Sequence, residues 1–388
     1  MTTNSELRVA LVGTGFMGRL HSIAYAILPS FFPELPPIRR RVVADVTQEL
    51  AQRGAKQFGY EEWAVEWEQV VTRSDVEIVD ITTPNELHRP IAELALQHGK
   101  HVLCEKPLAL SAEEARLMSQ CAKRSGAVHM VAFNYRRCPA VLEAKRLIDS
   151  GALGKIFHFR ALYLQDWAVP PDTPFTWRFS ADQSGSGALG DIGSHALDLA
   201  LYLVGEIASV VGLTETFVPA RAEAGSTGSR AVDVDDCAVA LLRFANGAVG
   251  TLEASRFSYG RKNFLTFEIS GSDGALAFNW ERSNELKFYS AEDRKELQGF
   301  RTIITGPAHP YGEIFWPIPG LGTAFVETQV IQIGDFVRAI SEGRSADTCF
   351  EHGWRVQEAM EAILASARAG QWKEVETRFA INERGDVR

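Results

Sequence analysis

Cysteine is scarce in this sequence, with five residues among 388 and no metal-type pairing of their positions. An odd number of such cysteines is typical of reduced, mostly buried thiols, and a structural zinc site is not expected. The sequence also lacks any run of about 20 apolar residues, the length that a membrane-spanning helix needs. We therefore expect neither a metal ion nor a membrane among the partners of this protein.

Basic residues are in deficit, because 40 lysines and arginines stand against 49 acidic residues, which leaves a net charge of -9. This charge opposes binding to a phosphate backbone, so no nucleic-acid partner is expected. A secretory leader is not expected either, because Met1 to Glu6 form a short polar lead that runs directly into a strand-like segment. That lead has no room for a basic region and an apolar signal core, so we expect a cytoplasmic protein.

The remaining composition is ordinary for a globular protein, with 46% hydrophobic and 23% charged residues. A chain of 388 residues exceeds the size at which one core usually stops growing, which favours two domains. From Leu7 to Ala132, short β-branched runs alternate with amphipathic stretches, a pattern typical of a doubly wound parallel sheet. The expected strands are Val9–Val12, Val42–Ala44, Ile78–Ile81, His101–Cys104 and Val128–Ala132.

A proline-rich insertion, Pro29 to Pro37, interrupts the first crossover. Its later prolines cannot continue the helix that begins near Met17, so we expect a surface loop. Beyond Arg137 the period changes, and roughly seven strand-like runs follow from Ile156 on. Turn signals such as Asn246-Gly247 and Ser272-Asp273-Gly274 favour a large open, mainly antiparallel sheet.

We expect a Rossmann domain at residues 1–133 and an α+β domain at residues 134–388. Two long segments rich in proline, glycine and aromatic residues, Ala168–Gly190 and Gly299–Gly322, are candidates for a lid and a pocket wall. Amphipathic helices are expected near Phe325–Glu342 and His352–Ala369.

A glycine-rich segment, Gly13-Thr14-Gly15-Phe16-Met17-Gly18, follows the first strand and opens a helix. Glycines at this spacing make a tight turn, let a pyrophosphate approach the backbone and pack the helix on the strand. The second strand ends at Asp45, whose carboxylate suits a ribose diol and would repel a 2'-phosphate. The segment predicts a dinucleotide site that prefers NAD to NADP; a structural glycine turn and a strand-end carboxylate are the alternatives.

Two polar segments follow later strands, where an open α/β sheet binds its ligand. Thr83-Pro84-Asn85 with His88 come after Ile78–Ile81, and Glu105-Lys106-Pro107 come after His101–Cys104. A lysine beside a cofactor can donate to a substrate hydroxyl and stabilise the alkoxide as it forms. A cis bond before Pro107 would be one way to fix that lysine. The alternative for Lys106-Pro107 is a surface turn.

Asp191 and His195 stand four residues apart in Gly190-Asp191-Ile192-Gly193-Ser194-His195, at the start of an apolar helix. This spacing places a carboxylate and an imidazole on one helical face. The pair can act as a base and its orienting partner, because histidine titrates near neutral pH. A helix-capping aspartate and a core histidine are the alternatives.

Taken together, the glycine turn, Thr83-Pro84-Asn85, Glu105-Lys106-Pro107, Asn134-Tyr135-Arg136-Arg137 and the Gly190–His195 segment resemble the glucose-fructose oxidoreductase, inositol dehydrogenase and rhizopine catabolism family. The resemblance spans nearly the whole chain. It implies a Rossmann domain followed by a domain with a large open sheet that serves substrate binding and oligomer contacts. A homo-oligomer, either a dimer or a tetramer, is therefore expected.

The resemblance also implies roles for single residues. The residues expected to be catalytic are Lys106, Asp191 and His195. Those expected to bind NAD are Gly13, Gly15, Phe16, Met17, Gly18, Asp45, Thr83, Pro84, Asn85, His88, Glu105, Lys106, Asn134, Trp177 and Arg178. Those expected to contact substrate are Lys106, Tyr135, Tyr163, Gln165, Trp167, Asp191 and His195.

The expected reaction is oxidation of a ring secondary hydroxyl of a sugar, an anhydrosugar or a cyclitol, with hydride transfer to NAD. His195 would accept the proton and Lys106 would steady the oxyanion, or the two would exchange these roles. Tyr163–Trp167, Phe31–Pro33 and His309–Tyr311 most resemble family members that oxidise the C3 hydroxyl of levoglucosan. The alternatives are an inositol dehydrogenase, an NAD-retaining glycosidase of the same fold and a non-catalytic regulator that senses a dinucleotide.

Overall fold

The computed structural model describes residues 6–223, 225, 228–318 and 320–376, so the polar lead at residues 1–5 lies outside the described residues. The chain forms two compact units. The first runs up to Pro139 and includes Asp182–Gly185 and Thr305–Trp354, whereas the second comprises Ala140–Ala181, Ser186–Ile304 and the residues from Arg355 on. Residues 305–354, which the sequence analysis assigned to the second domain, thus pack within the first unit.

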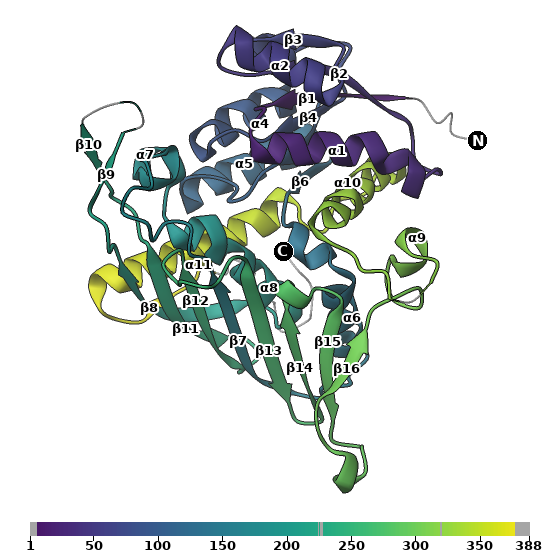
Figure 1. The fold of residues 1–388 in the computed structure, drawn as a ribbon, viewed down its shortest axis with the longest axis vertical. Helices are drawn as coiled ribbons and strands as arrows, with labels where there is room; N and C mark the ends of the chain where they lie inside the picture. The colour runs from purple at the N-terminus through teal and green to yellow at the C-terminus, as the bar shows by residue number, and fades with distance from the viewer. Residues whose placement is uncertain (1–5, 224, 226–227, 319, 377–388) are drawn as a thin grey trace. The chain divides into compact units, whose positions relative to one another are not determined.

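The first unit is built on a parallel sheet of six strands in the order β3-β2-β1-β4-β5-β6 (Figure 1). This confirms the doubly wound fold expected from the alternating pattern. The strand order reverses between β1 and β4, and doubly wound sheets bind ligands at such a point. The strands are β1 (Leu7–Val12), β2 (Ile38–Ala44), β3 (Glu62–Ala64), β4 (Ile78–Ile81), β5 (His101–Cys104) and β6 (His129–Val131).

Helices connect these strands, and their ends follow local chemistry. In α2 (Gln48–Phe58), the Thr47 hydroxyl accepts from the amide of Leu50 at the start, and Gly59 ends the helix with a φ of 71°. The other helical segments of this unit are α1 (Phe16–Phe31), α3 (Trp67–Val71), η1 (Asn85–Leu87), α4 (His88–Gln97), α5 (Ala112–Ser125), η2 (Asn134–Arg137), α9 (Gly312–Phe315) and α10 (Phe325–Glu342).

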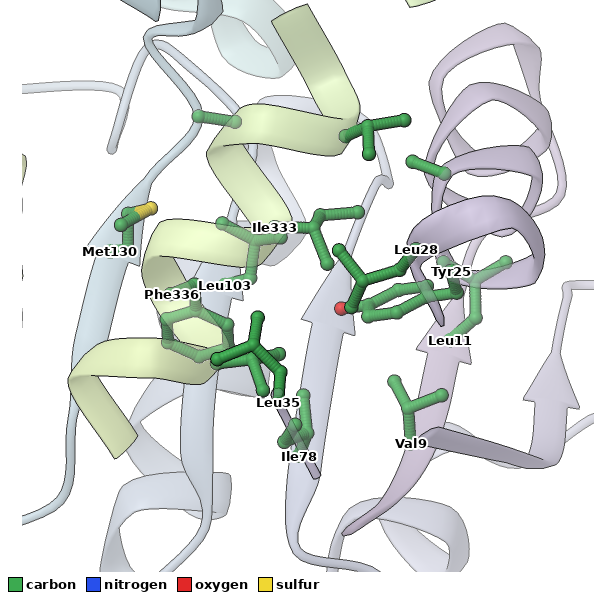
Figure 2. Packing of buried hydrophobic residues seen from close by; sticks show 14 of the residues in the cluster. Val9, Leu11, Tyr25, Leu28, Leu35, Ile78, Leu103, Met130, Ile333 and Phe336 are labelled. Carbon is green, nitrogen blue, oxygen red and sulfur yellow. The ribbon is translucent and has the colours of Figure 1, made fainter. Parts of the chain in front are cut away.

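The proline-rich insertion forms a loop after α1 in which Pro33, Glu34 and Pro37 are exposed, as expected, but other residues of the loop pack in the core of this unit. α1 continues through Pro29 to Phe31, and the following Phe32 and Leu35 are only 1% and 8% exposed. Their apolar side chains join a cluster with α10 residues such as Phe336, which lies beside the sheet in Figure 2. Burial of this apolar surface outweighs the tendency of prolines to mark exposed loops.

The second unit contains a sheet of nine strands in the order β16-β15-β14-β13-β7-β12-β11-β8-β17. Only the β7–β12 pair is parallel among the strand pairs of this described sheet, which confirms a large, mainly antiparallel sheet. Both expected turns join antiparallel neighbours. The strands are β7 (Ile156–Leu164), β8 (Ile207–Glu215), β11 (Cys237–Phe244), β12 (Val249–Ser255), β13 (Phe264–Gly271), β14 (Gly274–Asn279), β15 (Glu285–Ser290), β16 (Arg301–Ile304) and β17 (Lys373–Glu374).

A buried helix, α8 (Ser194–Leu203), contacts β7 of this sheet, and the π-turn η4 (Leu189–Gly193) leads into it and contacts β12. A Cβ on Gly193 would lie 3.1 Å from the Cβ of Ala254 on β12, so glycine permits this close packing. The remaining elements are α6 (Pro139–Asp149), η3 (Trp177–Phe179), α7 (Ala181–Ser184), β9 (Ala220–Ala222), β10 (Ser229–Ala231), η5 (Trp280–Arg282), η6 (Lys295–Leu297) and α11 (Phe350–Ala369). No helix in the described part of the chain is long and apolar enough to cross a membrane.

The two long segments proposed as lid and pocket wall have structure of their own. The first carries η3, and its Ala168 and Phe179 are fully buried in a small apolar cluster with Val232 and Val234. The second carries β16 and α9. Both segments therefore contain regular structure, rather than being unstructured throughout.

Candidate active site

The glycine-rich turn lies between β1 and α1 and has the form that a dinucleotide site requires. Gly13 has a φ of +100°, and a Cβ there would lie 2.7 Å from the carbonyl oxygen of Thr82. A Cβ on Gly18 would lie 2.2 Å from the carbonyl oxygen of Gly13, whereas one on Gly15 would meet no described atom within 4 Å. The outer glycines thus permit the tight turn, and Gly15 leaves open space where a pyrophosphate can approach the backbone.

Asp45 follows β2 and is bonded to this turn. One carboxylate oxygen accepts from the amide of Thr14 at 2.8 Å and from the Thr14 hydroxyl, and the other accepts from the amide of Val46 at 2.7 Å. These bonds hold a half-buried negative charge at the carboxyl ends of β1 and β2. The arrangement fits an adenosine ribose diol and disfavours a 2'-phosphate.

Replacing Asp45 by serine is expected to narrow the preference for NAD over NADP. In the unmodified protein, kcat/KM with NAD should exceed that with NADP by at least about tenfold, which corresponds to about 1.4 kcal/mol. The measurement is kcat/KM for both cofactors in the two proteins. Glu113→Gln, on the exposed side of α5, is the matched control and should leave the ratio unchanged. Equal efficiency with both cofactors before any substitution would show that Asp45 does not face the ribose.

The turns after β4 and β5 are tied together by His88. The ring is fully buried, and its nitrogens lie 3.0 Å from the carbonyl oxygen of Pro107 and 3.1 Å from that of Thr83. Burial lowers the pKa of His88, so the neutral ring donates to one of these carbonyls at a time. Both ring nitrogens of His88 are therefore occupied by the backbone of the two turns. Asn85 donates to the carbonyl of Ser184 at 2.9 Å.

Lys106 sits on the second of these turns. The Lys106-Pro107 peptide bond is cis, as the sequence analysis considered, and the Lys106 side chain is half-buried. Glu105 is 5% exposed, and one of its carboxylate oxygens accepts from the amide of Lys106 at 3.1 Å. The hydroxyl oxygen of Thr83 is buried with no hydrogen-bond partner among the described residues, which leaves a polar atom for a ligand at the neighbouring turn.

The Asn134-Tyr135 segment lies in the same unit, against α10. Asn134 donates its amide to the Thr328 hydroxyl at 3.0 Å, and Tyr135 packs its ring 5.9 Å from that of Phe325. Phe16, 68% exposed at the start of α1, also stacks on Phe325, with 6.4 Å between the ring centres. The structure thus brings Phe16 and Tyr135 to one aromatic residue that sequence reasoning missed.

The second unit carries the other expected residues. Asp191 lies in η4 with two guanidinium groups beside it, because its oxygens are 3.9 Å from Arg178 Nε and 4.0 Å from Arg256 Nη1. Asp235 fixes the start of this turn by accepting from the amides of Gly187 at 2.7 Å and Leu189 at 2.8 Å. A Cβ on Gly187 would lie 1.7 Å from the Asp235 carbonyl oxygen, so only glycine fits there.

Arg256 is a contact that the sequence analysis did not foresee. Its guanidinium is fully buried, donates to the carbonyls of Arg178 at 3.2 Å and Asp235 at 3.1 Å, and lies 5.3 Å from the ring centre of Trp167. Arg178 itself stacks over Trp177 at 4.4 Å. One buried cation therefore links the Trp177-Arg178 segment, Trp167 and the turn that carries Asp191.

His195 follows Asp191 in α8 and is 5% exposed. Its ring centre is 6.1 Å from that of Tyr163 on β7. The Tyr163 hydroxyl donates to Asn263 Oδ1 at 2.6 Å, and Gln165 Nε2 donates to the same oxygen at 3.0 Å. Trp167 Nε1 in turn donates to Gln165 Oε1 at 2.9 Å. Tyr163, Gln165 and Trp167 thus form one polar array, joined by Asn263, and Tyr163 places it beside His195.

Comparison with known proteins agrees with both halves of this description. Residues 7–133 match the model of an oxidoreductase family with an NAD-binding Rossmann fold, and residues 141–277 match that of the GFO/IDH/MocA C-terminal domain. The chain belongs to the GFO/IDH/MocA oxidoreductase family. It is an NAD-dependent oxidoreductase, and the resemblance found in the sequence is confirmed at the level of the family.

Within the GFO/IDH/MocA family, the chain is 47% identical to a levoglucosan dehydrogenase of Pseudarthrobacter phenanthrenivorans over 95% of this chain and 98% of that protein. A solved levoglucosan dehydrogenase in complex with NADH and levoglucosan has a TM-score of 0.94 at 47% identity, covering 96% of this chain and 100% of that one. A scyllo-inositol 2-dehydrogenase (NAD(+)) of Bacillus subtilis is 28% identical over 88% of both chains.

Proposed function

We propose that this enzyme oxidises the C3 hydroxyl of levoglucosan, or of a closely similar pyranose ring, and passes the hydride to NAD. The observation that carries the proposal is the polar array of Tyr163, Gln165 and Asn263 beside His195. Several neighbouring donors and acceptors suit a ring with several hydroxyl groups. The 47% identity to levoglucosan dehydrogenase, over almost the whole of both chains, supports the anhydrosugar as the first substrate to test.

The residues of the first unit are proposed to hold the cofactor. Gly13, Gly15 and Gly18 would take the pyrophosphate, Asp45 the adenosine ribose, and the Thr83 hydroxyl a polar group of the bound dinucleotide. NAD, when bound, accepts the hydride that the carbinol carbon loses. Trp177 and Arg178 are further proposed cofactor contacts.

The chemical step needs a group that takes the hydroxyl proton and one that stabilises the oxygen. We assign the first role to His195 and the second to the Lys106 ammonium, with Asp191 as the residue that orients its neighbours. The guanidinium groups of Arg178 and Arg256 beside Asp191 support this role.

A purified sample with NAD should produce NADH steadily from levoglucosan, more slowly from other pyranoses and inositols, and not from linear 2-hydroxy acids. Absorbance at the NADH band and identification of the sugar product measure this. Activity confined to 2-hydroxy acids would contradict the proposal. A higher kcat/KM with an inositol than with levoglucosan would favour the cyclitol alternative, which the similarity to scyllo-inositol 2-dehydrogenase supports.

The same assay separates the other two alternatives. An NAD-retaining glycosidase would cleave a glycoside without net NADH, whereas the proposed reaction forms one NADH for each ketone. A dinucleotide-sensing regulator would bind NAD without turnover. We further propose a cytoplasmic homo-oligomer, with the second unit providing the subunit contacts.

A further inference from the structure

Three buried polar side chains lie together in the first unit, beneath the turn that carries Lys106. Asp80 is 0% exposed within β4, where a lone carboxylate would be costly. His21 of α1, also 0% exposed, places Nδ1 at 3.0 Å from each oxygen of Asp80. The other ring nitrogen of His21 is 3.2 Å from Glu105 Oε1. The residues thus form a chain, Asp80–His21–Glu105, that ends at the residue before Lys106.

The geometry sets the charge of this chain. Nδ1 of His21 is hydrogen-bonded to Asp80, and Nε2 faces Glu105 as an ion pair without hydrogen-bond geometry. Carboxylates on both sides favour the doubly protonated ring. Burial lowers the pKa of His21, but the carboxylates of Asp80 and Glu105 raise it to about 10. Burial likewise raises the pKa of Glu105, yet the His21 imidazolium brings it below its ordinary value. Two carboxylates and one imidazolium leave the chain with a negative charge.

The remaining titratable groups around the chain do not remove this charge. Burial raises the pKa values of Tyr25 and Cys104, so both are neutral near pH 7, and burial lowers that of His88. Tyr60, whose pKa burial also raises, is neutral for the same reason. Lys106 interacts electrostatically with Glu105 and lowers its pKa. The negative end of the chain therefore lies next to Lys106.

The position of the chain in the fold is also informative. His21 is on the helix after β1, Asp80 is in β4, and Glu105 follows β5, so the three residues lie around the reversal of strand order. Ligands of doubly wound sheets bind above this point. Buried ionic groups seldom stabilise a fold more than apolar residues of the same size would. A role in the function therefore explains their presence better than stability does.

We propose that His21 and Asp80 are positioning residues for Lys106. They hold the Glu105 carboxylate ionised and in place; Glu105 then fixes the backbone of Lys106 through its 3.1 Å bond to the Lys106 amide and sets a negative charge beside the ammonium group. The inference rests on the proposed function, in which Lys106 stabilises the oxygen of the substrate.

The test compares two histidine variants of the full-length enzyme. In His21→Gln, Glu105 loses its cation and, being buried, takes up a proton near neutral pH. kcat for levoglucosan should fall by about 10- to 100-fold, the loss typical of residues that orient metal ligands, and should recover in part toward alkaline pH as Glu105 ionises. The Kd for NADH should stay within about threefold, a small change beside the loss of kcat.

The matched control is His129→Gln in β6 of the same unit. His129 accepts from the amide of Phe350 at 3.0 Å, and burial lowers its pKa to about 4, so it is a neutral histidine outside the site. This variant should lose stability without a change in kcat or in its pH profile. If His21→Gln behaves like His129→Gln, with kcat and pH profile unchanged and only its Tm lowered, the inference is wrong.

Two further variants extend the test. In the Glu105→Gln background, adding His21→Gln should lower kcat little further, because both act through one carboxylate; independent, additive losses would contradict the inference. If His21→Gln does not fold, Asp80→Asn replaces it. That variant keeps the His21–Glu105 pair but removes one carboxylate that stabilises the His21 imidazolium, so the pKa of His21 falls. Its kcat should therefore decrease at a lower alkaline pH than in the unmodified enzyme, and an unchanged pH profile would contradict the inference.

A measurement that does not depend on turnover separates this inference from the proposed function. NMR of the histidine rings, assigned with His21→Gln, should show His21 doubly protonated at pH 8. A neutral His21 at pH 8 would overturn the inference even if levoglucosan is oxidised. An inactive wild-type protein with a protonated His21 would instead reject the proposed substrate and support the charged chain.

Discussion

His195→Ala is expected to lower kcat for levoglucosan by about 10²- to 10⁴-fold, the usual loss when a general base is removed. The reason is that the imidazole would accept the hydroxyl proton in the transition state, so its loss affects kcat more than substrate binding. The ring lies at the start of α8, 6.1 Å from the ring of Tyr163. NAD affinity should be preserved, because the glycine turn and Asp45 belong to the other unit.

Loss of a purely structural histidine would lower stability rather than kcat, and Leu199→Ala is the control for that outcome. Leu199 is fully buried in the same helix, and its truncation should cost about 2–5 kcal/mol of stability without a change in kcat for the folded fraction. Measuring kcat, NADH affinity and Tm on both variants separates the two roles. A His195→Ala protein with a lowered Tm and normal kcat would assign His195 to the core.

Lys106→Met is expected to lower kcat by about 10²- to 10³-fold, the range found when one donor to a developing oxyanion is removed. Methionine keeps the length of the side chain up to the ε carbon and removes the ammonium group. The turn should persist, because the bond from the Lys106 amide to Glu105 belongs to the backbone. kcat and KM for levoglucosan, with the Kd for NADH, measure the effect.

Lys123→Met, at the exposed end of α5, is the control for the loss of one positive charge and should leave kcat unchanged. A Lys106→Met enzyme with normal kcat and only a raised KM for NAD would make Lys106 a cofactor contact instead. The pH profiles of kcat for the His195 and Lys106 variants also decide which residue is the immediate base. In the unmodified enzyme, kcat should fall toward acidic pH as the base is protonated, and the variant that lacks the base should lose this fall.

Much of the first unit could be predicted from sequence, because its signals are local. The glycine turn, the strands around Ile78–Ile81 and His101–Cys104, and the polar residues after them are set by neighbours in the chain. β3 was missed because it has only three residues, none of them buried. Phe32 was misplaced because its packing partners on α10 lie about 300 residues further along the chain.

The residues missed in the site depend on contacts that no local pattern carries. Arg256 follows β12 and Asn263 precedes β13, and both strands pair with β7 near Leu164. This register brings Asn263 to Gln165 and Arg256 to Trp167. Similarly, Asp80 could have been noticed as a polar residue within the apolar β4 sequence. Its partner His21 could not, because the pairing depends on β4 lying next to β1 in the sheet.

The most direct test of the account uses levoglucosan with deuterium at C3 and unlabelled NAD. We expect the label to appear in NADH, in a one-to-one ratio with the ketone formed, and the initial rate to fall relative to unlabelled levoglucosan if hydride transfer limits turnover. Label that stays in the sugar while NADH forms would place the oxidation at another carbon, and no NADH at all from levoglucosan would contradict the proposed function.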